Sequence, residues 1–421
     1  MNELPASVGQ RLLWLMDHYR GHRNSLNEQV VWHLRGPLDR AALDTAVRRL
    51  HERHDALRTT FVSRRRQFLQ IVNDPRPVPV TEHDVSGHEQ PRLAARDLVT
   101  AELTTPIDVS VWPTRVTLVR LAPEHHVVVL TMHHYVSDDW SNALLSRDIR
   151  ALYAGEPLPE VQWQYPRWAA WHRDQVEGER GPVLVDYWRR QLDGARLLAL
   201  PEAAEVPRGA DEPASVCVEL TLGPQVTAGL RALARKHRTT LFPVMLSLFY
   251  LALRRATGQS DLTVATLLAN RARPEVAETV GFFVTMALLR GRVEPGEPFG
   301  ELVRRTRSVV MDGLRHQELP SQLLPPGTVA GAGRTDDVMF HLLGSMMSRA
   351  DMAGDELDDL EAQLDRSRFA LEFVVVPRDD DLTALVLCDR DRFVPDWAQA
   401  LVKDYVELAA AVVADPSGAT A

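Results

Sequence analysis

The sequence predicts an α/β fold, because patterns typical of helices and of strands alternate from one end of the chain to the other. Residues 39–54 repeat apolar side chains at helical spacing, and Asp39 stands where a helix-capping residue is expected. Residues 127–132 are apolar and mostly β-branched, which is typical of a buried strand.

The later elements continue this alternation. Pro224 occupies the first position of a predicted helix, where its missing N–H leaves no hydrogen bond unmade. Gly258 follows an apolar helix in the position of a C-terminal cap. The other expected elements are helices over 141–153, 224–236, 241–257 and 395–413, and strands over 262–269, 371–376 and 382–388, the last two antiparallel.

Composition excludes several classes of function. The 421 residues are 45% hydrophobic and 25% charged, which is ordinary for a globular protein with a real core. The formal net charge of −9 argues against a nucleic-acid partner. Cys217 and Cys388 are the only cysteines, so neither a disulfide framework nor a zinc cluster is expected, and a reducing compartment is favoured. With no signal-peptide pattern and no run of about 18 apolar residues, we expect a cytoplasmic protein that binds no membrane.

The segment over residues 131–141, TMHHYVSDDWS, carries the clearest chemical signal. His133 and His134 end a buried strand, and Asp138 and Asp139 precede a helix. A histidine at a strand end can face a cleft, where neutral imidazole accepts a proton near physiological pH. Either histidine could instead be a satisfied core residue. A metal site would need a third ligand, so we expect no bound metal.

This segment resembles the HHxxxDG signature of condensation domains from nonribosomal peptide synthetases, and further motifs of that family follow in the same order along the chain. The stretches that resemble them are SVGQRLLW at 7–14, RHDALRTTF at 53–61, YPRWAAW at 165–171, YWRRQL at 187–192, ANR at 269–271, VGFFV at 280–284 and HQELP at 316–320. The resemblance therefore covers essentially the whole chain.

The resemblance implies two chloramphenicol-acetyltransferase-like lobes, arranged in a V with a tunnel between them. Residues 1–175 would form the N-terminal lobe with the histidine motif, and residues 176–421 the C-terminal lobe. Peptidyl carrier proteins would bring substrates on phosphopantetheine arms to His134, without a bound cofactor. His134 would position or deprotonate an acceptor amine. His133 would be mainly structural, and Asp138 would pair with Arg271.

The sequence departs from the family pattern at several motif positions. Asp139 replaces the glycine of HHxxxDG, which adds bulk and a negative charge that could block the site or disfavour an oxyanion. Thr285 replaces the asparagine of FVNT. The stretches 334–340 and 368–371 match the family motifs RNPLFQVMF and KFDL incompletely.

These departures favour a catalytically silent, X-type domain of the kind found in glycopeptide-antibiotic synthetases. Such a domain recruits cytochrome P-450 oxygenases to the carrier-bound peptide. The alternative is an active condensation domain that forms an amide or an ester, and the retained His134 fits that alternative. Epimerising or carrier-independent acyltransferases of the same superfamily form a third possibility.

Overall fold

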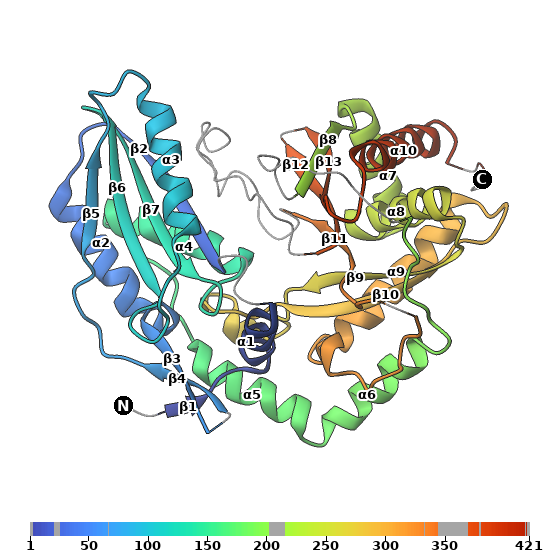
Figure 1. Ribbon diagram of the computed structural model, residues 1–421, viewed down its shortest axis with the longest axis horizontal. Helices are drawn as coiled ribbons and strands as arrows, with labels where there is room; N and C mark the ends of the chain where they lie inside the picture. The colour runs from blue at the N-terminus through green and yellow to red at the C-terminus, as the bar shows by residue number, and fades with distance from the viewer. Residues whose placement is uncertain are drawn as a thin grey trace. The chain divides into compact units, whose positions relative to one another are not determined.

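The structure is a computed structural model, which describes residues 3–20, 26–65, 67–201, 215–331, 333–343, 369–378, 380–416 and 418 (Figure 1). It confirms the predicted α/β fold, and the described residues form helices and three β-sheets. Arg368, the first residue of the incomplete KFDL motif, lies outside the described residues.

The chain divides into two compact units. The first contains Met1–Gly178 and the short stretch Arg271–Val284, which we call the inserted segment. The second contains Glu179–Asn270, Thr285–Met346 and Leu364–Ala421. The sequence divides the chain after residue 175, whereas the structure adds the inserted segment, from far along the chain, to the first unit.

The first unit is built on a four-stranded sheet in the order β2-β7-β6-β5, with a smaller three-stranded sheet in the order β1-β4-β3. Only the β5–β6 pair is parallel among these strands. The strands are β1 (Glu3–Pro5), β2 (Asn27–Arg35), β3 (Thr59–Arg64), β4 (Gln67–Val72), β5 (Val80–Asp84), β6 (Thr114–Ala122) and β7 (His125–His133).

Helices cover both faces of the four-stranded sheet (Figure 1). Alternate residues of β7 point to opposite faces, so Val128 and Leu130 pack with α2 (Arg40–Arg53) and α4 (Asp139–Ala154). Val127 and Val129 pack instead with α3 (Pro91–Thr104). The remaining helices of this unit are α1 (Val8–Arg20), α5 (Tyr165–Glu177) and the short η1 (Asp55–Arg58) and η2 (Pro274–Val276).

Helix caps explain where the two inner helices begin. Asp39 caps α2 as predicted, and its carboxylate accepts a 2.9 Å hydrogen bond from the amide of Ala42. The helix expected from residue 141 begins earlier, at Asp139, because Asp138 caps it by accepting from the amide of Ser141 at 2.8 Å. A cap residue three places before the expected start therefore lengthens α4 by two residues at its N-terminus.

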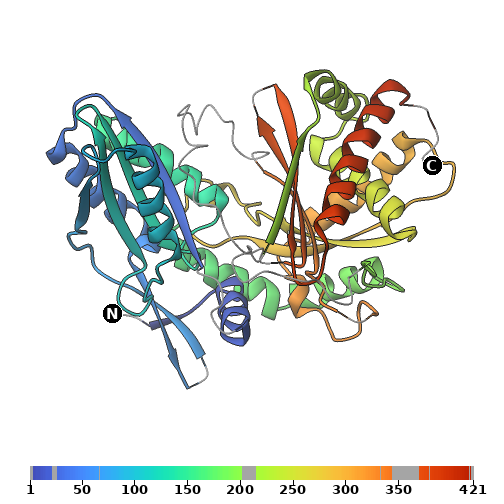
Figure 2. The ribbon, with the colours of Figure 1, turned by 45° about the horizontal axis from the view of Figure 1, so that its top comes forward.

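The second unit has one six-stranded sheet in the order β10-β9-β11-β12-β13-β8. Figure 1 and Figure 2 show several of its helices packed against this sheet. Pro224 opens one of these helices and Gly258, at φ 72°, closes another, as predicted. The elements are α6 (Arg180–Gln191), β8 (Ser215–Thr221), α7 (Pro224–Lys236), α8 (Leu241–Thr257), β9 (Asp261–Leu268), β10 (Thr285–Arg292), α9 (Phe299–Arg315), η3 (Ser321–Leu323), β11 (Val338–Leu342), β12 (Leu371–Arg378), β13 (Asp381–Asp389) and α10 (Pro395–Ala414).

The predicted hairpin is confirmed, since β12 and β13 pair antiparallel. Within the described ranges, none of the helices is long and apolar enough to cross a membrane.

Candidate active site

The candidate site lies in the first unit, where β7 ends and turns toward α4. His133 is the last residue of β7, and its amide donates to the carbonyl of Pro113 at 3.0 Å. The amide of His134 donates to the carbonyl of Leu26 at 2.6 Å, so strand-like pairing continues one residue beyond β7. The backbones of the two histidines are thus held by hydrogen bonds to two different segments of the chain.

The His134 ring is fixed through its Nδ1 atom. Nδ1 lies 2.9 Å from the carbonyl oxygen of Ser137, and the ring meets Phe282 edge to face with centroids 5.0 Å apart. A carbonyl can only accept a hydrogen bond, so the neutral ring carries its proton on Nδ1. Nε2 is then the unprotonated nitrogen, which is the state required of a general base. The side chain is 13% exposed.

A carboxylate that the motif does not contain also reaches this ring. Oε1 of Glu28, at the start of β2, lies 3.5 Å from Nδ1 of His134. Its other oxygen lies 3.5 Å from the side-chain amide of Asn142 in α4. Sequence reasoning missed Glu28, because it lies more than a hundred residues from the motif and only the pairing of β2 with β7 brings it near.

His133 has a different environment from His134. Its side chain is buried, its ring lies against Tyr135 with centroids 4.1 Å apart, and its Nδ1 accepts from the amide of Tyr135 at 3.2 Å. The contacts of this ring are therefore those of a residue that shapes the turn.

Asp138 is the centre of a buried polar network. Besides capping α4, it accepts from the amide of Phe283 at 3.0 Å and from the guanidinium of Arg271 at 3.1 Å. Arg271 also donates to the hydroxyl of Ser141 at 2.9 Å and lies over the Phe283 ring, 3.7 Å from its centroid. Burial lowers the pKa of Arg271, and the Asp138 charge opposes that shift. The structure thus brings together Asp138 and Arg271.

Asp139 is the first residue of α4, and its side chain is exposed. Acidic residues are favoured in the first turn of a helix, where the backbone N–H groups create positive potential. The aspartate that replaces the motif glycine therefore also has a structural reason to be there.

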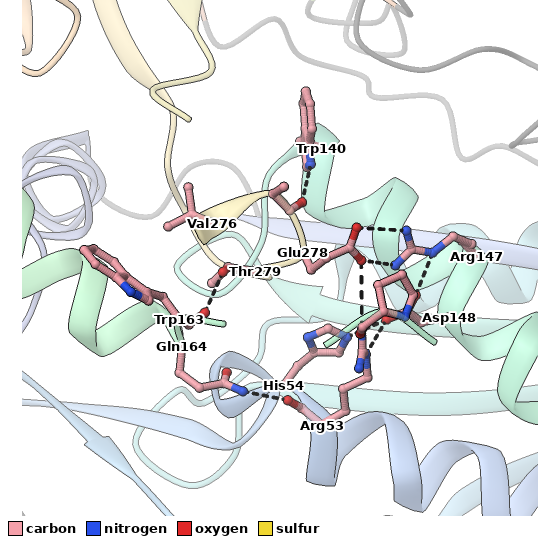
Figure 3. Close-up of polar contacts among 12 residues, drawn as sticks. Arg53, His54, Trp140, Arg147, Asp148, Trp163, Gln164, Val276, Glu278 and Thr279 are labelled. Atoms are coloured by element: carbon pink, nitrogen blue, oxygen red, sulfur yellow. Dashed lines mark hydrogen bonds and ion pairs between the residues drawn. The ribbon is translucent and has the colours of Figure 1, made fainter. Parts of the chain in front are cut away.

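The inserted segment is anchored to the first unit on both sides of Glu278 (Figure 3). The indole nitrogen of Trp140 donates to the carbonyl of Ala277 at 3.2 Å. The hydroxyl of Thr279 donates to the carbonyl of Trp163 at 2.6 Å. These bonds, with the buried Arg271, hold the stretch that supplies Phe282 to His134.

Glu278 itself joins a second cluster of charged residues, drawn in Figure 3, which we call the arginine–carboxylate cluster. Arg147 lies 2.5 Å from Glu278 and 2.6 Å from Asp148. Arg53 lies 2.8 Å from Asp148, and Nε2 of His54 lies 2.9 Å from the same carboxylate. The sequence did not identify this cluster, which joins α2, α4 and the inserted segment.

Thr285, which replaces the asparagine of the family motif FVNT, is hydrogen-bonded to another residue of the second unit. The side-chain amide of Asn270 donates to the Thr285 hydroxyl at 2.8 Å. The backbone N–H of Asn270 donates to the side-chain oxygen of Gln317 at 2.9 Å. Asn270 has φ 52°, a left-handed conformation that asparagine tolerates better than most residues. Asn270 lies in the ANR stretch at 269–271, so this bond joins that stretch to the Thr285 departure.

No group of three metal-ligating side chains occurs among the residues that the structure describes.

Comparison with known proteins identifies the family. Residues 1–421 match the Condensation domain family over the whole chain, so the chain belongs to the condensation-domain family. It is 31% identical to the phosphinothricin tripeptide synthetase PhsC of Streptomyces viridochromogenes, covering 98% of this chain and 39% of the relative. It is also 31% identical to the cyclosporin synthetase simA of Tolypocladium inflatum, covering 97% of this chain and 3% of the relative. The chain thus spans a minor part of these relatives.

Solved structures share the fold. The X-domain from teicoplanin biosynthesis superposes with a TM-score of 0.80 at 23% identity, covering 100% of this chain and 97% of that one. The SgcC5 protein from Streptomyces globisporus gives 0.79 at 24% identity, covering 99% and 100%. The fold is therefore the two-lobed, chloramphenicol-acetyltransferase-like fold of condensation domains.

Proposed function

We propose that this chain is a condensation domain of a nonribosomal peptide synthetase, with His134 as the proton acceptor. One observation carries this conclusion: Nδ1 of His134 is held by the Ser137 carbonyl, which leaves Nε2 as the basic nitrogen. The names of the relatives, several of which are peptide synthetases, support the assignment.

In the proposed reaction, the nitrogen of an acceptor amine attacks the carbonyl carbon of a donor thioester. A C–N bond forms and the C–S bond breaks. The amine proton passes to Nε2 of His134 and from there to the departing sulfur, so that an amide and a thiol result. Both substrates would arrive on the phosphopantetheine arms of peptidyl carrier proteins.

The test is a condensation assay with two loaded carrier proteins, in which product is followed by mass spectrometry. We expect product from the wild type, and a loss of about a hundredfold or more in His134→Ala. His88→Ala, which removes an exposed histidine of the same unit, is the matched control and should retain activity. Equal rates for the wild type and His134→Ala would overturn the proposal.

Asp139 supports a second candidate function, the silent X-type domain that recruits a cytochrome P-450 oxygenase. The carboxylate at the glycine position is the feature that favours it, and a structural neighbour is titled as a complex of the X-domain with OxyB from teicoplanin biosynthesis. That likeness, at 22% identity, concerns the fold.

The same assay separates the two functions when Asp139→Gly is included. Activity that appears only in Asp139→Gly would mean that this carboxylate silences an otherwise competent site. A wild type that forms no product but binds a P-450 oxygenase in a direct binding measurement would favour recruitment. Product from the wild type that disappears in His134→Ala would exclude the silent domain.

A further inference from the structure

We propose that Glu28 is a positioning residue for His134, which orients the ring through Nδ1 and stabilises the imidazolium that forms when Nε2 accepts a proton. This inference rests on the proposed function and adds a residue from outside the histidine motif. It makes the working unit a histidine–carboxylate pair that is assembled across two strands.

The strand register places the two side chains on one face. Glu28 is directly opposite Met132 in the antiparallel β2–β7 pair. Side chains alternate along a strand, so His134 lies two residues further on the same face as Met132, diagonal to Glu28. Met132 is fully buried in the core that includes residues of α4. Glu28 and His134 therefore meet at the end of the face that α4 covers.

Four side chains and one carbonyl close a ring of contacts around this pair. Oε1 of Glu28 lies 3.5 Å from Nδ1 of His134, and Oε2 lies 3.5 Å from the amide nitrogen of Asn142. The oxygen of Asn142 accepts from the hydroxyl of Ser137, whose carbonyl in turn lies 2.9 Å from Nδ1 of His134. Asn142 thus holds Glu28 toward the ring from α4.

The other charged groups around this turn are engaged differently. Asp138 is paired with Arg271 at 3.1 Å, so their charges largely offset one another at the ring. Asp139 is exposed at the first position of α4, and the His133 ring packs on Tyr135. The Glu28 carboxylate is in contact with the ring at 18% exposure, where solvent screens it incompletely. It therefore favours positive charge on His134.

The first test is an NMR titration of the full chain labelled in histidine, with the His134 signal assigned by its loss in His134→Ala. In Glu28→Gln the titration midpoint of His134 should move to lower pH by about one unit. Glu28→Asp, which keeps the charge on a shorter arm, should give a smaller shift in the same direction. Glu52→Gln removes an exposed glutamate of α2 and should leave the midpoint unchanged. An unchanged midpoint in a folded Glu28→Gln would overturn the proposal.

The second test is the pH dependence of kcat in the condensation assay. Removing the carboxylate should lower kcat about three- to tenfold and shift the acidic limb to lower pH by about one unit. A purely structural role would lower activity without moving that limb. If the wild type forms no product but the His134 midpoint still shifts, the catalytic role proposed for His134 fails while the Glu28–His134 coupling stands. If His134→Ala abolishes product and Glu28→Gln moves neither midpoint nor limb, the Glu28 inference alone fails.

Discussion

The first unit contains two histidine–carboxylate pairs that differ in burial and in their neighbours. His54 and Asp148 are 2.9 Å apart, and both side chains are fully buried. His134 and Glu28 are 3.5 Å apart, with 13% and 18% of their side chains exposed. The same two chemical groups therefore form a closed structural contact in one place and a solvent-accessible one in the other.

Arginines make the buried pair inert. Arg53 and Arg147 both contact Asp148, so its charge is already balanced. Burial lowers the pKa of His54, although Asp148 acts in the opposite direction. Burial raises the pKa of Asp148, but the hydrogen bonds and charges of His54 and Arg147 outweigh it and lower that pKa to about 2. A fully buried histidine that contacts an aspartate already paired with two arginines stabilises the fold and has no access to a substrate.

The largest expected effect is on stability when the buried pair is broken. Asp148→Asn keeps the shape but removes the fully buried carboxylate that Arg53, Arg147 and His54 share, so the free energy of unfolding should fall by about 3–5 kcal/mol. Urea denaturation of the full chain measures this. Asp44→Asn, in an exposed pair with Arg40, is the control and should change stability by less than about 1 kcal/mol. If Asp148→Asn also lowered the free energy of unfolding by less than about 1 kcal/mol, the buried pair would not be the structural contact described above.

The pH dependence of stability should reflect buried histidines rather than His134. Burial lowers the pKa of His51 from 6.5 to about 4. The two ring nitrogens of His51 are hydrogen-bonded to the Val47 carbonyl and to the Thr114 hydroxyl. The unfolded chain therefore binds a proton that the folded chain excludes. Stability from this group is complete above pH 6.5 and falls by up to about 3 kcal/mol as the pH drops toward 4. Denaturation at several pH values should show a flatter curve for His51→Gln. A curve as steep as that of the wild type would exclude His51 as the source.

A smaller effect is expected where the inserted segment meets the arginine–carboxylate cluster. Glu278 and Arg147 are partly exposed, so Glu278→Gln should cost about 1 kcal/mol. Hydrogen exchange should accelerate at residues 276–283 and leave the second unit unaffected. Exchange that accelerates equally in both units would show that the contact does not act locally.

The smallest expected effect on stability is at the accessible pair. Glu28→Gln removes a charge from a weaker, partly exposed contact and should change the free energy of unfolding by less than about 1 kcal/mol. Thermal and urea unfolding of Glu28→Gln and Asp148→Asn, run in parallel, measure this change in the free energy of unfolding. A loss as large as that of Asp148→Asn would make the two pairs equivalent in role.

Local sequence signals predicted much of the fold. Asp39, Pro224 and Gly258 mark helix ends through their own backbone chemistry, and the structure confirms all three. The sequence pattern places the start of α4 two residues too late, because the motif position of Asp138 does not reveal its role as a helix cap.

The candidate site was only partly predictable, because its contacts depend on pairing between distant segments. His134 stands out in sequence as part of a doublet at a strand end. Glu28 becomes significant only through the register of β2 on β7, and Asp148 only through the packing of α2 against α4. The Asn270–Thr285 bond joins two positions that looked independent along the chain.

The inserted segment has a consequence for the order of synthesis. Its Val276, Val280 and Phe283 belong to the same core as α2 and α4, yet the ribosome reaches them long after Gly178. At about 5–20 residues per second, the early unit waits on the order of ten seconds with an incomplete core. A nascent chain stalled between the two stretches should therefore expose apolar surface, and chaperones would find their longest opportunity for binding there.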